Sequence, residues 1–335
     1  MAYEAELAAG IEAVRAASRV CRSVQKRLAT AKALQKKDKS PVTVADFASQ
    51  AIVCERLLRA LPRDAIVGEE GSQELRQGEQ TKLLDSVVRE VASEVRHEFD
   101  RHEVLAWIDR GGATAAGPRY WTLDPIDGTK GFLRGEQYAV ALALIEHGEV
   151  VVGILGCPNL DDGSGGRGVL LAAVRGREAR SLPLWSEGSE EKGDEGTAIG
   201  VSNVKSTAAA RFCESVEAEH SDQEQSARIA EELGITQEPF RIDSQCKYAA
   251  IARGDASIYL RMPTRKDYQE KIWDHAAGLL IVEAAGGRVT DVEGLPLDFT
   301  RGRTLAANQG VVATCGPIHD RVIEVVKRVR AGDSS

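Results

Sequence analysis

The chain has 335 residues, of which 43% are hydrophobic and 28% are charged, as is typical of a globular protein. Its formal net charge of −8 argues against a general nucleic-acid-binding surface. No run of about 18 or more apolar residues occurs, so no membrane-spanning helix is expected. The chain is long for a single core, and we therefore expect two packed subdomains.

The first elements are predicted to be two helices and a strand. Residues 3–35 predict a helix, because they are rich in Ala, Leu, Val, Glu and Arg and contain only Gly10 as an unfavourable residue. A charged loop and a short extended segment over residues 36–50 should lead to a second helix that ends near Leu61. Residues 65–71 indicate a short strand that ends in acids and a glycine turn.

The next part of the chain is expected to form a helix and several strands. Residues 79–99 predict a charged helix, and residues 104–109 are compatible with a strand. Residues 120–158 show a strand pattern, an acidic turn and a β-hairpin that turns at His147 and Gly148.

The second half of the chain is predicted to be of the α/β type. The acidic, glycine-rich segment 186–196 predicts an exposed loop near the subdomain boundary. Beyond it, strands and helices alternate, which is typical of an α/β arrangement. The predicted strands are residues 198–203, 257–262, 286–292 and 310–316, and the predicted helices are residues 226–234, 244–254, 273–287 and 319–330.

Cysteine usage and the N-terminus favour a reducing, cytoplasmic location, while an organellar location stays open if a transit peptide has been removed. The six cysteines are scattered and show neither a CxxC motif nor a zinc-ligand spacing, so we expect them to be reduced, while a regulatory disulfide stays open. They are Cys21, Cys54, Cys157, Cys213, Cys246 and Cys315. Acidic residues in the first helix and the lack of an apolar stretch there disfavour a secretory or organellar targeting segment.

The segment LDPIDGT carries the strongest chemical signal. Asp124 and Asp127 flank a proline turn directly after an apolar stretch, and a buried carboxylate pair this close is costly without a cation. Pro125 fixes its own φ and biases Asp124 toward an extended conformation, which separates the two aspartates. Gly128 permits a close turn, so the amides of Gly128 and Thr129 are candidates to hold a phosphate oxygen.

Further acids occur in comparable contexts, namely Asp46 in TVADF, Glu69 and Glu70 in VGEEG, and Asp274 in IWDHAAG. Taken singly, such residues are more often helix caps or solvated turns than metal ligands. Taken together, carboxylates from separate parts of the chain suit hard divalent cations, which prefer oxygen ligands, and a multi-metal site for phosphoryl transfer.

The order VTxADxxxQ, GEE, DPIDGT and WDHAAG resembles the inositol monophosphatase superfamily of Mg²⁺-dependent, lithium-sensitive phosphatases. The continuation DGTKGFLRGEQYAVALALIE resembles the 3′(2′),5′-bisphosphate nucleotidases of fungi and plants. These enzymes are similar to this chain over nearly its whole length. The resemblance implies a sugar-phosphatase fold, mixed α+β and α/β, with αβαβα layers. It also implies an N-terminal α+β subdomain, 1–195, with most metal ligands, and a C-terminal α/β subdomain, 196–335, with the nucleotide contacts.

The resemblance implies roles for individual residues. Two or three Mg²⁺ ions would be held by the side chains of Glu69, Asp124, Asp127 and Asp274 and by the carbonyl of Ile126. Asp46 and Thr129 match the pair that orients and deprotonates the attacking water, and the metal lowers the pKa of that water. Glu70 would support this shell or bind a loosely held further ion.

A second group of residues matches nucleotide-contacting positions of the same relatives. His220, Ser244, Lys247 and Arg261 belong to it, beside Gly128, Thr129 and Asp274 of the catalytic segments. On a helix, Ser244 and Lys247 would face the same side and hold the phosphate that is not cleaved, while Arg261 would point inward from a strand end. Without the resemblance, His220 would be a surface histidine, and Lys247 and Arg261 would be ordinary solvated charges. Lys130, Arg134 and Glu136 are further candidates to shape the pocket.

The resemblance implies hydrolysis of adenosine 3′,5′-bisphosphate to AMP and phosphate, with the 2′,5′ isomer and 3′-phosphoadenylyl sulfate as further substrates, lithium inhibition and a role in sulfur metabolism. The expected partner is a small nucleotide, not nucleic acid or membrane, for a monomer or weak dimer. Three alternatives stay open: an inositol polyphosphate 1-phosphatase on the same scaffold, a non-catalytic nucleotide sensor, and redox control through the cysteines.

Overall fold

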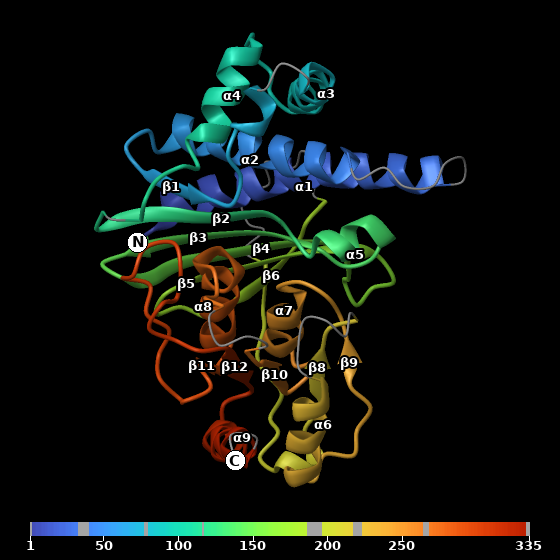
Figure 1. Cartoon of the computed structure of the whole chain (residues 1–335), viewed down its shortest axis with the longest axis vertical. Helices are drawn as coiled ribbons and strands as arrows, with labels where there is room; N and C mark the ends of the chain where they lie inside the picture. Colours follow the sequence, from blue (N-terminus) through green and yellow to red (C-terminus); the bar gives the residue numbers. More distant parts are fainter. Residues whose placement is uncertain are drawn as a thin grey trace.

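The chain folds into five layers, in which helices and sheets alternate. The structure is a computed structural model that describes residues 2–32, 40–76, 80–115, 117–185, 196–216, 223–263 and 268–332. Figure 1 shows two sheets with one helical layer between them and one on each outer side. This arrangement confirms the predicted order αβαβα and the mixed fold class.

The first layer is a pair of long helices that covers one face of the larger sheet. α1 (Glu4–Lys32) and α2 (Ser40–Ala60) pack against each other and against strands of that sheet, with α3 (Thr81–Ala92) and α4 (Arg101–Asp109) outside α2 (Figure 1). In α1 the buried residues recur at three- and four-residue spacing, which places them on one side of the helix. They include Ala13, Ala17, Val20 and Val24.

The larger sheet has seven strands in sequence order. β1 is parallel to β2, and every later neighbour pair is antiparallel. The strands are β1 (Ala65–Gly68), β2 (Arg119–Asp127), β3 (Ala139–Glu146), β4 (Glu149–Asp161), β5 (Arg167–Val174), β6 (Arg180–Pro183) and β7 (Thr197–Ala198). The predicted hairpin is confirmed: β3 and β4 are joined by His147 and Gly148, both with positive φ, as a tight two-residue turn requires.

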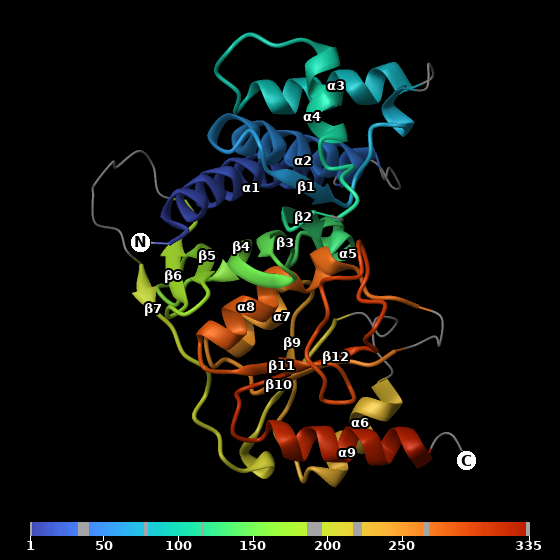
Figure 2. The same ribbon diagram turned by 90° about the vertical axis from the view of Figure 1, so that its left-hand side faces the viewer.

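The central layer consists of α7 (Cys246–Ala252) and α8 (Ala276–Ala284), which lie between the two sheets (Figure 2). Both helices are buried over almost their whole length, because each has a sheet on two sides. The short helix α5 (Thr129–Arg134) follows β2, and a 3-10 turn, η5 (Ile272–Asp274), precedes α8. These ends of α7, α8 and β2 meet at the candidate site.

The smaller sheet has the strand order β11-β12-β10-β8-β9. Its strands are β8 (Phe212–Glu214), β9 (Phe240–Arg241), β10 (Ile258–Arg261), β11 (Arg288–Thr290) and β12 (Val311–Thr314). The outer helices α6 (Gln223–Glu232) and α9 (His319–Gly332) form the last layer (Figure 2). Two 3-10 turns complete the described elements, η1 (Glu74–Arg76) and η3 (Thr207–Ala209).

Three predictions for the N-terminal half were wrong. Residues 104–109 are helical, because Asp100 accepts from the Glu103 amide while the Glu103 side chain accepts from the Asp100 amide, a capping box that starts α4. The TVADF segment is helical, since α2 already begins at Ser40. The helix expected over residues 79–99 spans only α3.

Some expectations stay predictions. The loop at 186–195 and the last residues of the first predicted helix, 33–35, lie outside the described residues. The division into 1–195 and 196–335 is not settled by the sheets, because β7 still pairs with β6 of the larger sheet.

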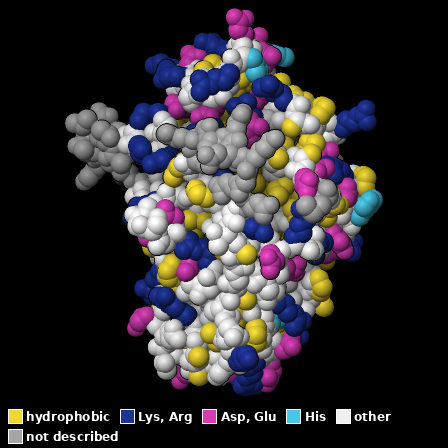
Figure 3. Space-filling model, turned by 180° about the vertical axis from the view of Figure 1, so that it is seen from behind, with side chains coloured by type: hydrophobic (Ala, Val, Ile, Leu, Met, Phe, Trp, Pro, Cys, Tyr) yellow, Lys and Arg dark blue, Asp and Glu magenta, His cyan; other side chains and the backbone are white. Residues whose placement is uncertain are grey.

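No helix in the described ranges has the length and apolar character needed to cross a bilayer. On the face drawn in Figure 3, basic and acidic side chains are interspersed.

Candidate active site

A cavity of about 360 Å³ opens where β2, α5, α7, β10 and η5 converge. It gathers residues from both halves of the sequence, since β2 and α5 precede residue 135 and the other elements follow residue 245. Most of the predicted site residues line it. They are Glu69, Asp124, Ile126, Asp127, Gly128, Thr129, Lys130, Ser244, Lys247, Arg261 and Asp274.

The end of β2 presents the two aspartates. The pairing of β2 with β3 is irregular between Asp124 and Asp127, where Pro125 has no amide to donate to the ladder. The Ile126 amide donates to Oδ1 of Asp124 at 3.1 Å, and the buried Ser49 hydroxyl donates to the Pro125 carbonyl at 3.0 Å. Both carboxylates line the cavity at this bulge.

The loop that carries Glu69 is fixed by the side chain of Gln50. Nε2 of Gln50 donates to the carbonyls of Glu70 (2.6 Å) and Ile108 (2.9 Å), and the Glu70 amide donates to Oε1 of Gln50 at 3.0 Å. A Cβ added to Gly68 or to Gly111 would lie 2.5 Å from the Gln50 amide group, so a side chain at either position would displace that group from its hydrogen bonds. Gln50 follows Asp46 by one helical turn of α2. This spacing is visible in the sequence, but it does not by itself reveal the role of Gln50.

The carboxylates repel one another in the absence of a cation. Burial raises the pKa of Asp124, and the charges of Glu69 and Asp127 raise it further. Burial and the charge of Asp127 likewise raise the pKa of Asp274. The side chain of Glu69 lines the cavity. The surrounding protein still desolvates its carboxylate, and this desolvation together with the charge of Asp127 raises the pKa of Glu69 as well. Such a group of oxygen donors fits hard divalent cations, which would offset the repulsion.

Asp46 and Glu70 lie beside this group. Burial raises the pKa of Asp46, with contributions from the charges of Glu70 and Glu69. Burial and the charge of Glu69 also raise the pKa of Glu70 to about 7. The Thr129 hydroxyl donates to the Ile126 carbonyl at 3.5 Å, and across the described ranges no hydrogen bond joins Asp46 to Thr129. The structure thus brings Asp46 close to the acidic group without forming the predicted pair.

The cavity is also lined by two cationic side chains. Lys247 is only 6% exposed, and its Nζ donates to the Ser215 hydroxyl at 3.1 Å and lies 5.4 Å from the centre of the Tyr259 ring. Burial lowers the pKa of Lys247, while the charge of Asp127 opposes this effect. Arg261, at the end of β10, lines the cavity beside it. Two positive side chains therefore line the same cavity as the carboxylates, and Nη2 of Arg261 lies 3.9 Å from Oδ2 of Asp274.

Ser244 reaches the cavity by a different route than predicted. It precedes α7 and has a positive φ of 66°, so helical spacing does not explain why it and Lys247 share one side. Gly128 packs against it, since a Cβ at Gly128 would lie 2.8 Å from that of Ser244. The next amide, of Gln245, donates to the carboxylate of Asp127. The turn before α7 thus connects the predicted nucleotide-contacting residues with the acidic group.

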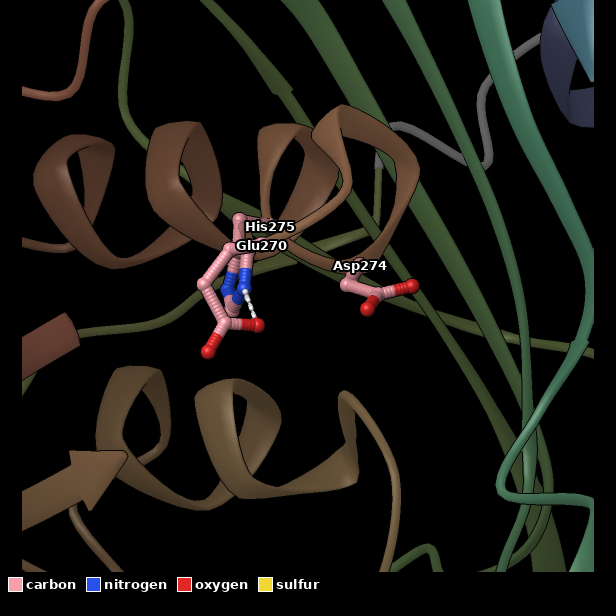
Figure 4. Close-up of side chains that lie close together, drawn as sticks. All are labelled: Glu270, Asp274 and His275. Carbon is pink, nitrogen blue, oxygen red and sulfur yellow. Dashed lines mark hydrogen bonds and ion pairs between the residues drawn. The ribbon is translucent and has the colours of Figure 1, made fainter. Parts of the chain in front are cut away.

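Glu270, Asp274 and His275 form a compact group near the cavity. Among the described residues they are the three acidic, histidine or cysteine side chains whose ligand atoms all lie within 4.8 Å of one another. Figure 4 shows that Glu270 and His275 point toward each other and that Asp274 points away from them. Nε of Arg261 donates to Oε2 of Glu270 at 2.7 Å, so a guanidinium already neutralises this carboxylate.

The remaining predicted residues have varied positions. His220 lies outside the described residues, so its nucleotide contact stays a prediction. Arg134 and Glu136 do not line the cavity; Arg134 pairs with Glu136 and with Asp243, which does. Sequence reasoning missed the residues that position the predicted site residues, because most of their contacts join positions far apart in sequence. They are Gln50, Ser215, Gln245, Glu270, His275 and Arg303.

Comparisons with known proteins agree with this geometry. The model of the "Inositol monophosphatase family" matches residues 3–330. The chain is 47% identical to a 3′(2′),5′-bisphosphate nucleotidase of Emericella nidulans, over 88% of this chain and 90% of that protein. It is 44% identical to a protein of the same name from Schizosaccharomyces pombe, over 99% and 98%.

Solved structures show the same fold at lower sequence identity. An inositol monophosphatase from Anabaena (Nostoc) sp. PCC 7120 superposes with a TM-score of 0.63 at 20% identity, over 98% of this chain and 97% of that one. An enzyme described as IMPase from Thermotoga maritima gives a TM-score of 0.58 at 21% identity, over 94% and 96%.

Proposed function

We propose a reaction and a substrate for this chain, which belongs to the inositol monophosphatase family. The chain is a phosphoric monoester hydrolase that removes the 3′-phosphate of adenosine 3′,5′-bisphosphate and yields AMP and phosphate. The names of its relatives at 44–47% identity support this choice of substrate. The 2′,5′ isomer and 3′-phosphoadenylyl sulfate are proposed as further substrates, which would connect the enzyme with sulfur metabolism.

The observation that carries the proposal is that one cavity holds both acidic and basic side chains. The carboxylates suit cations that bind the phosphate to be cleaved, and Lys247 and Arg261 suit a second, permanent phosphate. A buried ammonium group is costly unless it meets negative charge, and Lys247 is almost fully buried. A substrate with two separate phosphates matches both groups of side chains at once.

The carboxylate side is proposed to hold two or three Mg²⁺ ions through Glu69, Asp124, Asp127 and Asp274 and the carbonyl of Ile126. Bound there, the ions would supply positive charge that offsets the phosphate oxygens and favours ionisation of water. The chain's own residues orient this shell: the bulge in β2 directs Asp124 and Asp127, and Gln50 holds the loop of Glu69.

Water is proposed to attack the phosphorus in line with the leaving ester oxygen. The proton of this water would pass to Thr129 as the Thr129 hydroxyl donates to Asp46, and the raised pKa of Asp46 makes its carboxylate a better proton acceptor. This relay requires the Thr129 hydroxyl to turn away from the Ile126 carbonyl. An Asp46→Asn variant that hydrolyses the substrate as fast as wild type would reject the relay. A wild type that binds the nucleotide but releases no phosphate would favour a nucleotide sensor.

A nucleotide fits the cavity better than an inositol polyphosphate. Three tyrosines line it, and the side chain of Tyr268 is 37% exposed, which offers an aromatic face for a purine base. An inositol ring carries hydroxyls and phosphates and gains little from such a surface. The tyrosines are Tyr248, Tyr259 and Tyr268.

The deciding experiment is a parallel assay with Mg²⁺. Phosphate release is measured from adenosine 3′,5′-bisphosphate and from inositol 1,4-bisphosphate, and the nucleotide product is identified by chromatography. We expect AMP as the product and a clear preference for the nucleotide. A preference for the inositol bisphosphate, or release of the 5′-phosphate, contradicts the proposal. Lithium should inhibit the reaction, and resistance to high millimolar lithium counts against the assignment.

Location and assembly complete the proposal. All six cysteines are buried and unpaired, which supports a reducing compartment such as the cytoplasm. We propose that the protein acts as a monomer or weak dimer on a free nucleotide, without nucleic acid or membrane partners.

A further inference from the structure

A chain of buried contacts ends at Arg261. The Tyr248 hydroxyl lies 2.7 Å from Nδ1 of His275, and Nε2 of His275 lies 3.2 Å from Oε2 of Glu270. The same oxygen of Glu270 accepts from Nε of Arg261 at 2.7 Å. Tyr248, His275 and Glu270 are all less than 5% exposed. Three buried side chains therefore form a chain of contacts that ends at one arginine of the cavity.

These contacts link the three buried side chains to Arg261. An ionised Glu270 only accepts hydrogen bonds, so Nε2 of His275 carries the proton that it donates. The other ring nitrogen, Nδ1, lies within hydrogen-bonding distance of the Tyr248 hydroxyl. Each of the three side chains thus has a partner in the network, and a satisfied buried network is rigid.

The position of Arg261 matters because a second carboxylate competes for it. Its Nη2 lies 3.9 Å from Oδ2 of Asp274, a proposed metal ligand. Glu270 holds Nε at the shorter distance of 2.7 Å and so keeps the guanidinium beside Asp274 without a close ion pair. An Arg261 that moved onto Asp274 would neutralise a metal ligand and leave the second phosphate without its cation.

We propose that Glu270, supported by His275, is a positioning residue that fixes Arg261 for the phosphate that is not cleaved. The inference rests on the proposed function, since it assigns Arg261 to the second phosphate. Glu270 lines no part of the cavity in the described ranges and acts only through Arg261. A metal site at Glu270, Asp274 and His275 is the competing interpretation, and the guanidinium on Glu270 opposes a cation there.

The test compares wild type with Glu270→Gln, Arg261→Gln and the double variant. The dissociation constant of AMP is measured by calorimetry with Mg²⁺ and needs no turnover. The ratio of kcat/KM for adenosine 3′,5′-bisphosphate to that for adenosine 3′-monophosphate reports recognition of the second phosphate. We expect Glu270→Gln to weaken AMP binding about tenfold and to lower the ratio about tenfold. In the Arg261→Gln background the same change should alter neither quantity.

A conservative variant and a second site protect the test against misfolding. Glu270→Asp keeps the charge and should recover part of the ratio. If Glu270→Gln does not fold, His275→Gln takes its place, and it should also lower the ratio. Equal losses on both substrates with unchanged AMP affinity, or additive losses in the double variant, overturn the inference, as does a wild type that does not bind AMP. A wild type whose AMP affinity depends on Glu270 as expected but that releases no 3′-phosphate rejects only the proposed function.

Discussion

Arg303 donates a hydrogen bond of 2.6 Å to the carbonyl of Gly68, the residue directly before Glu69. It also donates to the Ala113 carbonyl at 3.2 Å, and its guanidinium carbon lies 4.7 Å from the centre of the Trp273 ring, next to Asp274. One side chain thus contacts the segments of two proposed metal ligands that are about 200 residues apart in sequence. It links the larger sheet with η5.

Replacing Arg303 should therefore weaken metal binding. In Arg303→Met we expect the Mg²⁺ concentration for half-maximal activity to rise about tenfold, because Glu69 and Asp274 lose their common support. The measurement is phosphate release against Mg²⁺ concentration. Arg301→Met is the matched control, since Arg301 is exposed and pairs only locally with Asp298. An equal Mg²⁺ requirement in both variants would show that Arg303 does not align the ligands.

The acidic group predicts an unusual dependence of stability on pH. Without metal, the folded chain binds protons that the unfolded chain releases at the ordinary carboxyl pKa of about 4, because burial and mutual repulsion raise the pKa values. The free energy of unfolding should then fall as pH rises from about 4 toward 7. Glu70, with a pKa of about 7, extends the effect to neutral pH.

Thermal unfolding with EDTA and with millimolar Mg²⁺ tests this dependence. With EDTA we expect the midpoint to fall by about 5 °C or more across the window, and with Mg²⁺ the fall should be much smaller. Asp124→Asn should flatten the curve in EDTA. A midpoint in EDTA that is constant or rises over this range would contradict the raised pKa values.

Lys247 should matter for activity and not for stability. Lys247→Met removes a buried ammonium group and keeps the volume, so we expect kcat/KM for adenosine 3′,5′-bisphosphate to fall about 100-fold while the unfolding midpoint is unchanged or higher. The exposed Lys327, paired with Glu293, supplies the control Lys327→Met. A drop in stability with little loss of kcat/KM would mean that Lys247 is structural.

Gly111 should be intolerant of a side chain. A Cβ there would lie 2.5 Å from Nε2 of Gln50, and Gln50 holds the Glu70 main chain on both sides. In Gly111→Ala we expect about 2 kcal/mol lower stability and reduced activity. Gly71→Ala, with no atom near the added carbon, is the control. Equal stability of the two variants would show that the Gln50 contacts are easily rearranged.

Local sequence predicted those parts of the fold that local chemistry determines. The turn at His147 and Gly148 follows from residues that accept positive φ between alternating strands. Residues 104–109 look like a strand because apolar residues dominate, but the capping box from Asp100 to Glu103 determines a helix. TVADF is likewise β-prone in composition and helical in α2, where packing against α1 and the sheet outweighs propensity.

Only those residues of the candidate site that belong to short sequence motifs could be predicted from the sequence. Asp124 and Asp127 could be assigned to one site because they flank a single proline turn. The positive φ of Ser244 and the contact between the Gln245 amide and Asp127 depend on how the two sheets are stacked. Glu270 and Arg303 give no local signal, since each acts on residues brought near by tertiary folding.

The most direct test of the whole account is a crystal structure with Mn²⁺ in place of Mg²⁺ and with AMP and phosphate, with the metals located by anomalous scattering. The account predicts at least two peaks about 3.5–4 Å apart among Glu69, Asp124, Asp127 and Asp274, with the AMP phosphate on Lys247 and Arg261. No peak among these carboxylates, or a single peak at Glu270 and His275, would contradict it.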